Sequence, residues 1–186
     1  RSTLFPYTTL FRSRSTTDFS RIVMIASLGG WEKQVTLTNS EFGSQIVISN
    51  YNELVEFRTA VNNGSTGEYQ GIANIDGFSG TTVKLNSNIT ITANWTPIGA
   101  AANPFKGTFD GQGHTVSNLR HTSISTPRGL FGYIENATIK NLNVKTGTGS
   151  TILKATTYCG GIVGSATKST IQDCAFNGDI TATSTW

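Results

Sequence analysis

Apolar residues recur at matched positions in three short stretches in the second half of the chain. The stretches 115–119, 138–142 and 170–174 read TVSNL, TIKNL and TIQDC, so their offsets are 23 and then 32. Because self-similarity at a period of roughly 20–50 residues is typical of repeat folds, we interpret them as successive units of one repeat, whose basic length is the shorter offset. The longer last interval is explained by an insertion within 145–158, which is rich in Thr and Gly.

A second motif repeats with the same offset of 32 and without a gap. Residues 129–132 read GLFG and residues 161–164 read GIVG. The offset also aligns Asn141 with Asp173 and Val144 with Phe176. The residues that define the repeat are Gly129, Leu130, Phe131, Gly132, Ile139, Asn141, Leu142, Gly161, Ile162, Val163, Gly164, Ile171 and Cys174. This match predicts that the two units share one backbone conformation.

Within one unit, the apolar residues alternate as in a β-strand but change phase once. Leu142 and Val144 alternate, whereas Ile139 lies three residues before Leu142. A bend or bulge at 140–141 would turn all three side chains to the interior, and Asn141 tolerates the left-handed backbone of such a bend. One short unit cannot bury its own apolar face, but stacked units can. We therefore predict an all-β fold, a parallel β-helix (solenoid).

Two other folds share parts of this pattern. A leucine-rich repeat has a similar period, but its characteristic spacing of leucine and asparagine is absent from this chain. A β-sandwich would require the gapless match between the last two units to be a coincidence.

One segment has helical periodicity. Leu54, Phe57 and Val61 share a helix face over 52–61, with Asn52 as the expected N-cap, acidic Glu53 in the first turn and a stop at 62–64. Because a solenoid needs a cover for its open end, we predict that this short helix is the N-terminal cap. Strands are expected at 81–85 and 88–92 as the first coil, and at 35–37 and 46–48 without a placement.

The two ends of the chain suggest a fragment. Residues 3–13 read TLFPYTTLFRS, the translation of a common sequencing adapter, so we treat residues 1–13 as an adapter-derived artefact. Residues 14–50 are unassigned and partly β, and residues 51–186 contain the capping helix and the coils. The chain begins without Met and stops just after an expected strand. We therefore expect a truncated C-terminus and a signal peptide lost upstream.

Charge does not indicate a nucleic-acid partner. The formal net charge of +3 falls to +1 without Arg1 and Arg12, and charged residues make up only 13% of the chain. Such a balance gives no electrostatic reason to bind nucleic acid or an anionic membrane. No apolar run is long enough for a membrane-spanning helix.

Residues 129–144 resemble the GLUG repeat, which is named for its G-L-hydrophobic-G core. Residues 161–164 resemble a second copy, and 95–99 and 104–119 resemble the coil that often precedes such repeats. Together the resemblance covers about 51–181. It implies a right-handed β-helix from an exported bacterial surface protein, and the residues before 51 match nothing comparable.

The resemblance also implies a function class. Proteins with these repeats include adhesin-like proteins and non-catalytic stretches of surface peptidases. We therefore expect a non-catalytic display or adhesion module at the cell surface or outside the cell. Its expected partners are a host or environmental glycan or protein, and further β-helix coils of the same parent chain. A carbohydrate-active β-helix enzyme fragment and a spacer region of a surface peptidase stay open as alternatives.

The titratable residues do not form a convincing catalytic set. Asp110 and His114 lie close in sequence and could act as an acid/base pair, but glycoside hydrolysis needs two carboxylates and no second one lies nearby. We interpret Asp110 as a turn residue that binds its own backbone. His121 has no visible ligand partners, and Asp173 and Asp179 are isolated. No catalytic residue, cofactor or metal is expected.

Three further residues have two interpretations each. Trp95 could stack on a glycan, but its motif favours burial in the core. Cys174 occupies an apolar repeat position and is expected in the core. A Cys159–Cys174 disulfide stays open, because two cysteines do not define a disulfide framework.

Overall fold

The computed structural model describes residues 21–28, 31–38, 44–121, 127–147, 153–155 and 158–182. The proposed adapter segment 1–13 and half of the segment 145–158 lie outside these residues. The chain divides into two compact units, Arg1–Ser44 and Gln45–Trp186. In the first unit, β1 (Arg21–Leu28) and β2 (Trp31–Thr38) pair antiparallel, which confirms a strand over 35–37.

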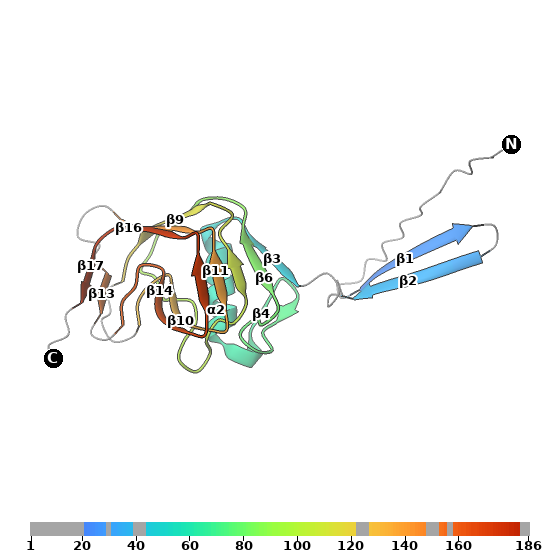
Figure 1. Cartoon of the computed structure of the whole chain (residues 1–186), viewed down its shortest axis with the longest axis horizontal. Helices are drawn as coiled ribbons and strands as arrows, with labels where there is room; N and C mark the ends of the chain where they lie inside the picture. The colour runs from blue at the N-terminus through green and yellow to red at the C-terminus, as the bar shows by residue number, and fades with distance from the viewer. Residues whose placement is uncertain are drawn as a thin grey trace. The chain divides into compact units, whose positions relative to one another are not determined.

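The described residues of the second unit form one α-helix and many short strands (Figure 1). Its elements are β3 (Gln45–Ile48), α2 (Tyr51–Asn62), η1 (Gly64–Thr66), β4 (Glu68–Tyr69), β5 (Ile72–Ala73), β6 (Thr82–Leu85), β7 (Ile89–Thr90), β8 (Thr108–Asp110), β9 (Thr115–Leu119), β10 (Phe131–Glu135), β11 (Thr138–Lys140), β12 (Asn143–Thr146), β13 (Leu153–Ala155), β14 (Val163–Thr167), β15 (Thr170–Gln172), β16 (Ala175–Asn177) and β17 (Ile180–Ala182).

Most of these strands belong to parallel sheets. A five-stranded sheet has the order β15-β11-β8-β6-β3, and a four-stranded sheet has the order β16-β12-β9-β7. Two-stranded parallel sheets join β10 to β14 and β13 to β17, and β4 and β5 form a small antiparallel pair. The chain enters the first three sheets in turn, through β8, β9 and β10 and then through β11, β12 and β14. The prediction of a mostly β, parallel-stranded fold with one helix is confirmed.

The longer of the two sequence offsets is the true register of neighbouring strands. Thr138 lies beside Thr170, and Ile139 lies beside Ile171. The same offset relates Phe131 to Val163 in the sheet of β10 and β14. These pairs confirm that the two units share one conformation.

The alignment based on the shorter offset is wrong. Thr138 pairs with Thr108 on its other side, whereas TVSNL forms β9 in a different sheet. In that sheet, Val116 of β9 pairs with Val144. TVSNL and TIKNL look alike because each combines a short β-strand with an asparagine in the left-handed conformation, Asn118 or Asn141. The pattern therefore reports a local conformation and does not reveal which sheet a strand enters.

The expected asparagine corners are present. Asn118, Asn141 and Asp173 have φ of 60°, 52° and 52°. Asn141 lies between β11 and β12, so the predicted bend at 140–141 is the corner at which the chain passes from one sheet to the next. Ile139 and Leu142 on either side of it are fully buried. A short polar side chain suits this backbone, because it can bond to neighbouring groups in place of regular pairing.

One row of apolar side chains crosses the five-stranded sheet. In register, the row consists of Ile46, Val83, Phe109, Ile139 and Ile171. The first four are fully buried, whereas Ile171 in the outermost strand is 45% exposed. Alternation on a pleated strand therefore places this row inside, with Thr and Lys side chains on the opposite face.

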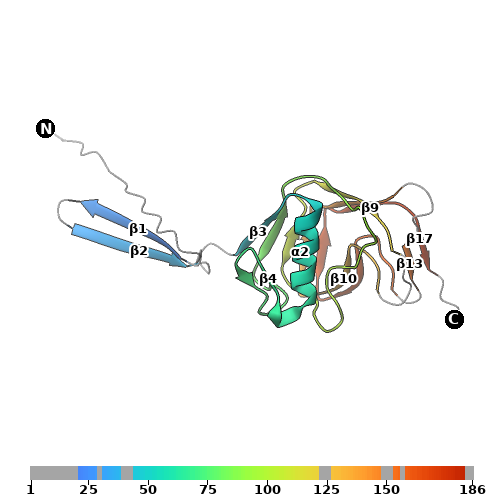
Figure 2. The same ribbon diagram turned by 180° about the vertical axis from the view of Figure 1, so that it is seen from behind.

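The helix α2 covers part of this core (Figure 2). Its buried side consists of Leu54, Phe57, Ala60 and Val61. The Phe57 ring lies 5.9 Å from the ring of Phe105 and 6.4 Å from that of Phe109. These contacts join the helix to the strands through aromatic packing.

The start of the helix differs from the prediction. The N-cap is Asn50, not Asn52: its Oδ1 accepts from the Glu53 backbone N at 3.0 Å. The Glu53 carboxylate in turn accepts from the Ser49 backbone N at 2.6 Å. The N-cap therefore lies two residues earlier than predicted, and the Glu53 carboxylate holds the N–H of the residue before the N-cap. The stop at 62–64 is confirmed, with Asn63 as the C-cap.

The strand expected at 46–48 without a placement is β3. β3 precedes α2 in sequence but pairs parallel with β6 and forms one edge of the five-stranded sheet. The strand at 81–85 is therefore not the first of this sheet. The reason is that Ile46 and Ile48 alternate in phase with Val83 and Leu85, and all four are buried.

Candidate functional site

A groove lies between α2 and the segment from η1 to β4. Its volume is about 780 Å³, and it is open to solvent. Its lining residues are Glu53, Val55, Glu56, Thr59, Ala60, Asn63, Thr66, Gly67, Glu68, Tyr69 and Gln70. Glu56 and Thr59 come from the exposed side of the helix and Glu68 from β4. The groove therefore joins residues that the sequence pattern did not connect.

The groove is acidic. Its lining contains three carboxylates and no Lys or Arg. Burial raises the pKa of the Tyr69 hydroxyl, with the charges of Glu53 and Glu56 acting in the same direction against a hydrogen bond from Gln70. Because Glu53 already caps the helix, Glu56 and Glu68 are the carboxylates left to accept hydrogen bonds from a ligand. Such a surface suits hydroxyl or cationic groups.

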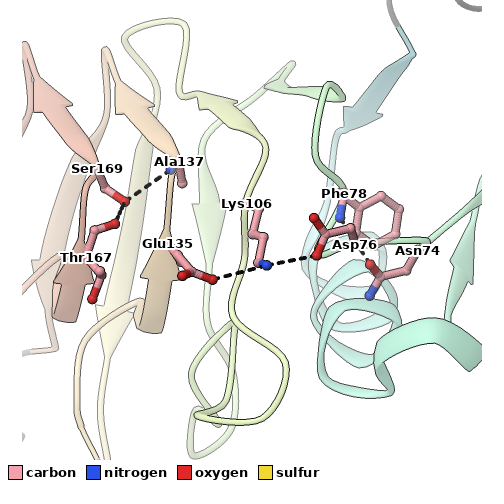
Figure 3. A network of polar contacts seen from close by, with 8 residues as sticks. All are labelled: Asn74, Asp76, Phe78, Lys106, Glu135, Ala137, Thr167 and Ser169. Carbon is pink, nitrogen blue, oxygen red and sulfur yellow. Dashed lines mark hydrogen bonds and ion pairs between the residues drawn. The ribbon is translucent and has the colours of Figure 1, made fainter.

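A polar network links loops on another part of the unit (Figure 3). The Lys106 ammonium lies 2.8 Å from Asp76 Oδ1 and 3.1 Å from Glu135 Oε2. These two carboxylates raise the pKa of Lys106. Nearby, Asn74 is buried and donates to the Ala60 carbonyl oxygen at 3.0 Å. Because the Asp76 side chain is 62% exposed, we interpret the Lys106 ion pairs as solvated links between loops.

Asp110 is held by contacts within its turn and to the neighbouring strand. Its Oδ1 accepts from the Gln112 backbone N and from Asn141 Nδ2, both at 3.0 Å. Its Oδ2 lies 3.4 Å from Lys140 Nζ. The pKa of Asp110 is lowered: burial acts upward, but the hydrogen bonds and the Lys140 charge outweigh it. The interpretation of Asp110 as a turn residue is confirmed, and it also ties β8 to the next strand of the sheet.

Trp95 lies in the core and not on a glycan-binding surface. It is 3% exposed, and its Nε1 donates to the Leu130 carbonyl oxygen at 2.9 Å. The Arg58 guanidinium lies 5.0 Å from the centre of its ring. The predicted burial of Trp95 is confirmed. The alternative, that Trp95 stacks on a sugar, is wrong because neither face of its ring is open to solvent.

His121 is buried beside this tryptophan. Its Nδ1 lies 2.8 Å from the Trp95 carbonyl oxygen and its Nε2 lies 3.2 Å from the Gly129 carbonyl oxygen. Burial lowers the pKa of His121 to about 4, and the charge of Arg128 acts in the same direction. The two carbonyl oxygens oppose this effect but do not overcome it. The imidazole is therefore neutral near pH 7, and one ring nitrogen is the donor.

The glycines of the two GLUG-like segments lie against neighbouring backbone or rings. A Cβ on Gly132 would lie 2.6 Å from the Gly99 carbonyl oxygen. A Cβ on Gly161 would lie 2.1 Å from the Phe176 ring. Between the first pair of glycines, Leu130 and Phe131 are fully buried. These positions serve close packing.

The two cysteines are not joined in a disulfide. Cys174 is half-buried and packs against the core, whereas its repeat partner Leu142 is fully buried. Burial raises the pKa of both thiols, and the charge of Arg128 opposes this effect at Cys159. The prediction that Cys174 lies in the core is therefore only partly confirmed. The reason is that β15 and β16, the strands on either side of it, are the outermost described strands of their sheets.

The described residues contain no group of three or more His, Cys, Asp or Glu placed to hold a metal ion. No helix in the described part of the chain is long and apolar enough to cross a membrane. Comparisons of the chain with family models, with curated proteins and with solved structures found no match.

Proposed function

We propose that the second unit is a right-handed parallel β-helix that serves as a non-catalytic display or adhesion module of an exported bacterial surface protein. The register carries this proposal: Thr82, Thr108, Thr138 and Thr170 follow one another at similar intervals along the chain and lie side by side in one sheet. The intervening chain passes through the four-stranded sheet each time, and from β8 onward also through the sheet of β10 and β14. Right-handedness follows from the strong preference of parallel crossover connections.

The adhesion role rests on two supports. One is the resemblance of 129–144 to GLUG repeats, from which the extracellular location also comes. The other is the acidic groove, where Glu56 and Glu68 face solvent beside amide and hydroxyl groups. Carboxylates and amides are suited to the hydroxyl groups of sugars, so a glycan is the partner we place in this groove.

The test is binding of the full chain to immobilised glycans and matrix proteins. We expect glycan binding that the double substitution Glu56→Gln and Glu68→Gln weakens about tenfold. Glu135→Gln is the matched control, because it removes a carboxylate outside the groove. Binding that is equal in all variants would remove the groove from the proposal. A chain that binds no surface, or one that releases reducing sugar from polysaccharides, would overturn the function itself.

A further inference from the structure

The threonine hydroxyls that line the acidic groove already donate their hydrogens within the chain. Thr59 donates to a backbone carbonyl oxygen at 2.8 Å, and Thr66 donates to another at 3.0 Å. A hydroxyl whose hydrogen is engaged can only accept a further hydrogen bond. The ionised carboxylates of Glu56 and Glu68 are acceptors only, and both residues are exposed. A ligand in the groove therefore meets acceptors on α2, on η1 and on β4.

The side-chain amide of Gln70 is engaged as well. Its Nε2 donates to the Val47 carbonyl oxygen at 2.7 Å and to the Tyr69 hydroxyl oxygen at 3.4 Å, so both of its hydrogens are used. Within the described residues, the side chains of the lining that can still donate are the Asn63 amide and the Tyr69 hydroxyl. Acceptors therefore outnumber donors in this groove.

The Tyr69 hydroxyl is the buried polar group of the groove. Tyr69 is only 7% exposed, and its hydroxyl accepts from Gln70 but donates to no described residue. It lies close enough to Glu53 and Glu56 for their charges to act together with burial in raising its pKa, so it keeps its hydrogen near neutral pH. Buried hydroxyl groups are normally hydrogen-bonded, and a ligand in the groove would supply the acceptor.

We propose that the groove binds amino sugar residues, whose ammonium groups pair with Glu56 and Glu68 while a sugar hydroxyl accepts from Tyr69. This inference rests on the proposed function and narrows its glycan to one class. An ammonium group brings three donors and a positive charge to a lining that contains no Lys or Arg. An acetylated amine lacks this charge, and a uronic acid would place a carboxylate beside like charges.

The experiment measures binding of the full chain to three oligosaccharides of equal length by isothermal titration calorimetry at low salt. They are a glucosamine oligomer, its N-acetylated counterpart and a uronic acid oligomer. We expect the glucosamine oligomer to bind about tenfold more tightly than its acetylated counterpart, a ratio appropriate to two solvent-accessible ion pairs. The uronic acid oligomer should bind most weakly. Added salt should reduce the preference, because it screens exposed charges.

Three variants separate the charge from the hydroxyl group. The double substitution Glu56→Gln and Glu68→Gln should remove most of the preference, because it removes the charges and keeps the side-chain size. Tyr69→Phe should weaken both oligomers about threefold and keep the preference, because it removes one uncharged hydrogen bond. Glu135→Gln, which removes a carboxylate outside the groove, should change neither quantity. Circular dichroism checks that each variant is folded.

Equal binding of the amino and acetylated oligomers would overturn the proposal, and so would a preference that survives the loss of both carboxylates. An oligolysine of the same charge that binds as tightly as the glucosamine oligomer would overturn it too, because the groove would then select charge and not a sugar. In each of these cases a chain that still binds glycan keeps the proposed function. A chain that binds no glycan at all fails the proposed function as well.

Discussion

The side-chain amide of Gln70 bonds to both backbone groups of Val47. Its Nε2 donates to the Val47 carbonyl oxygen at 2.7 Å, and its Oε1 accepts from the Val47 N–H at 3.2 Å. One side chain thereby substitutes for a neighbouring strand at the outer edge of β3. Edge strands with unpaired backbone groups are templates for association, so this contact protects the Val47 part of that edge.

Removal of this contact should destabilise the unit and open the edge. We expect Gln70→Ala to cost about 1 kcal/mol of unfolding free energy, because two solvent-accessible hydrogen bonds are lost. Self-association should also increase, since the groups of Val47 become available. Urea unfolding and sedimentation velocity measure the two effects. Gln112→Ala is the matched control, because Gln112 has a φ of 51° against 52° for Gln70. Equal behaviour of the two variants would contradict this role of Gln70.

The two isoleucines at the same repeat position should differ in stability. Ile139 is fully buried, whereas its neighbour Ile171 is 45% exposed. We expect Ile139→Ala to cost about 3 kcal/mol and Ile171→Ala less than about 1 kcal/mol, because the cost follows the buried volume that is lost. Urea unfolding of monomeric protein at low concentration makes the comparison. Similar costs at both positions would show that Ile171 is covered in solution.

Acid should destabilise the protein through His121. Its pKa is about 4 in the folded state against an ordinary value of 6.5. The contribution is complete above pH 6.5 and is lost as pH falls toward 4, because the unfolded state then binds a proton that the folded state does not. The loss should reach roughly 3 kcal/mol near pH 4.

Unfolding free energies between pH 7.5 and 4.5 test this linkage. The His121→Asn variant should lose much of the pH dependence in this window. His114→Asn is the control, since His114 lies in the turn before β9 and is less buried than His121. The role assigned to His121 is incorrect if the two variants keep the same pH profile.

Two substitutions at Asn141 should separate the cost of backbone strain at this corner from the cost of losing the side-chain hydrogen bond. Asn141→Ala should cost about 2 kcal/mol, because alanine disfavours a φ of 52° and the bond to Asp110 is lost. Asn141→Gly should cost less, about 1 kcal/mol, because glycine accepts this backbone. Thermal or urea unfolding distinguishes them. A glycine variant as unstable as the alanine variant would assign the whole effect to the side chain.

Several features were predictable because they depend on local pattern. The register between β11 and β15 follows from a gapless match, and apolar alternation places Ile139, Leu142 and Val144 inside. The left-handed corners follow from the preference of Asn and Asp for that backbone. The helix over 52–61 follows from its apolar face, although its cap lies two residues earlier than predicted.

The candidate groove was not predictable in the same way. Glu53 and Glu56 could be placed on the exposed side of a helix from their spacing. Glu68 reaches them only because the chain turns back through η1 and β4 after the helix ends. No periodic signal marks such a return, since it depends on a short turn and on the packing of Tyr69 against Phe57.

The sequence by itself determined which residues face inward, where the backbone turns, and that the strands at 138–140 and 170–172 lie side by side. The tertiary structure alone decided that TVSNL enters a different sheet from TIKNL, that β3 closes one edge, and that Gln70 covers Val47. The physical reason is one of range. Side-chain alternation and corner preferences act within a few residues, whereas the choice of sheet and of edge depends on loops of unequal length and on contacts that form only after the strands have stacked.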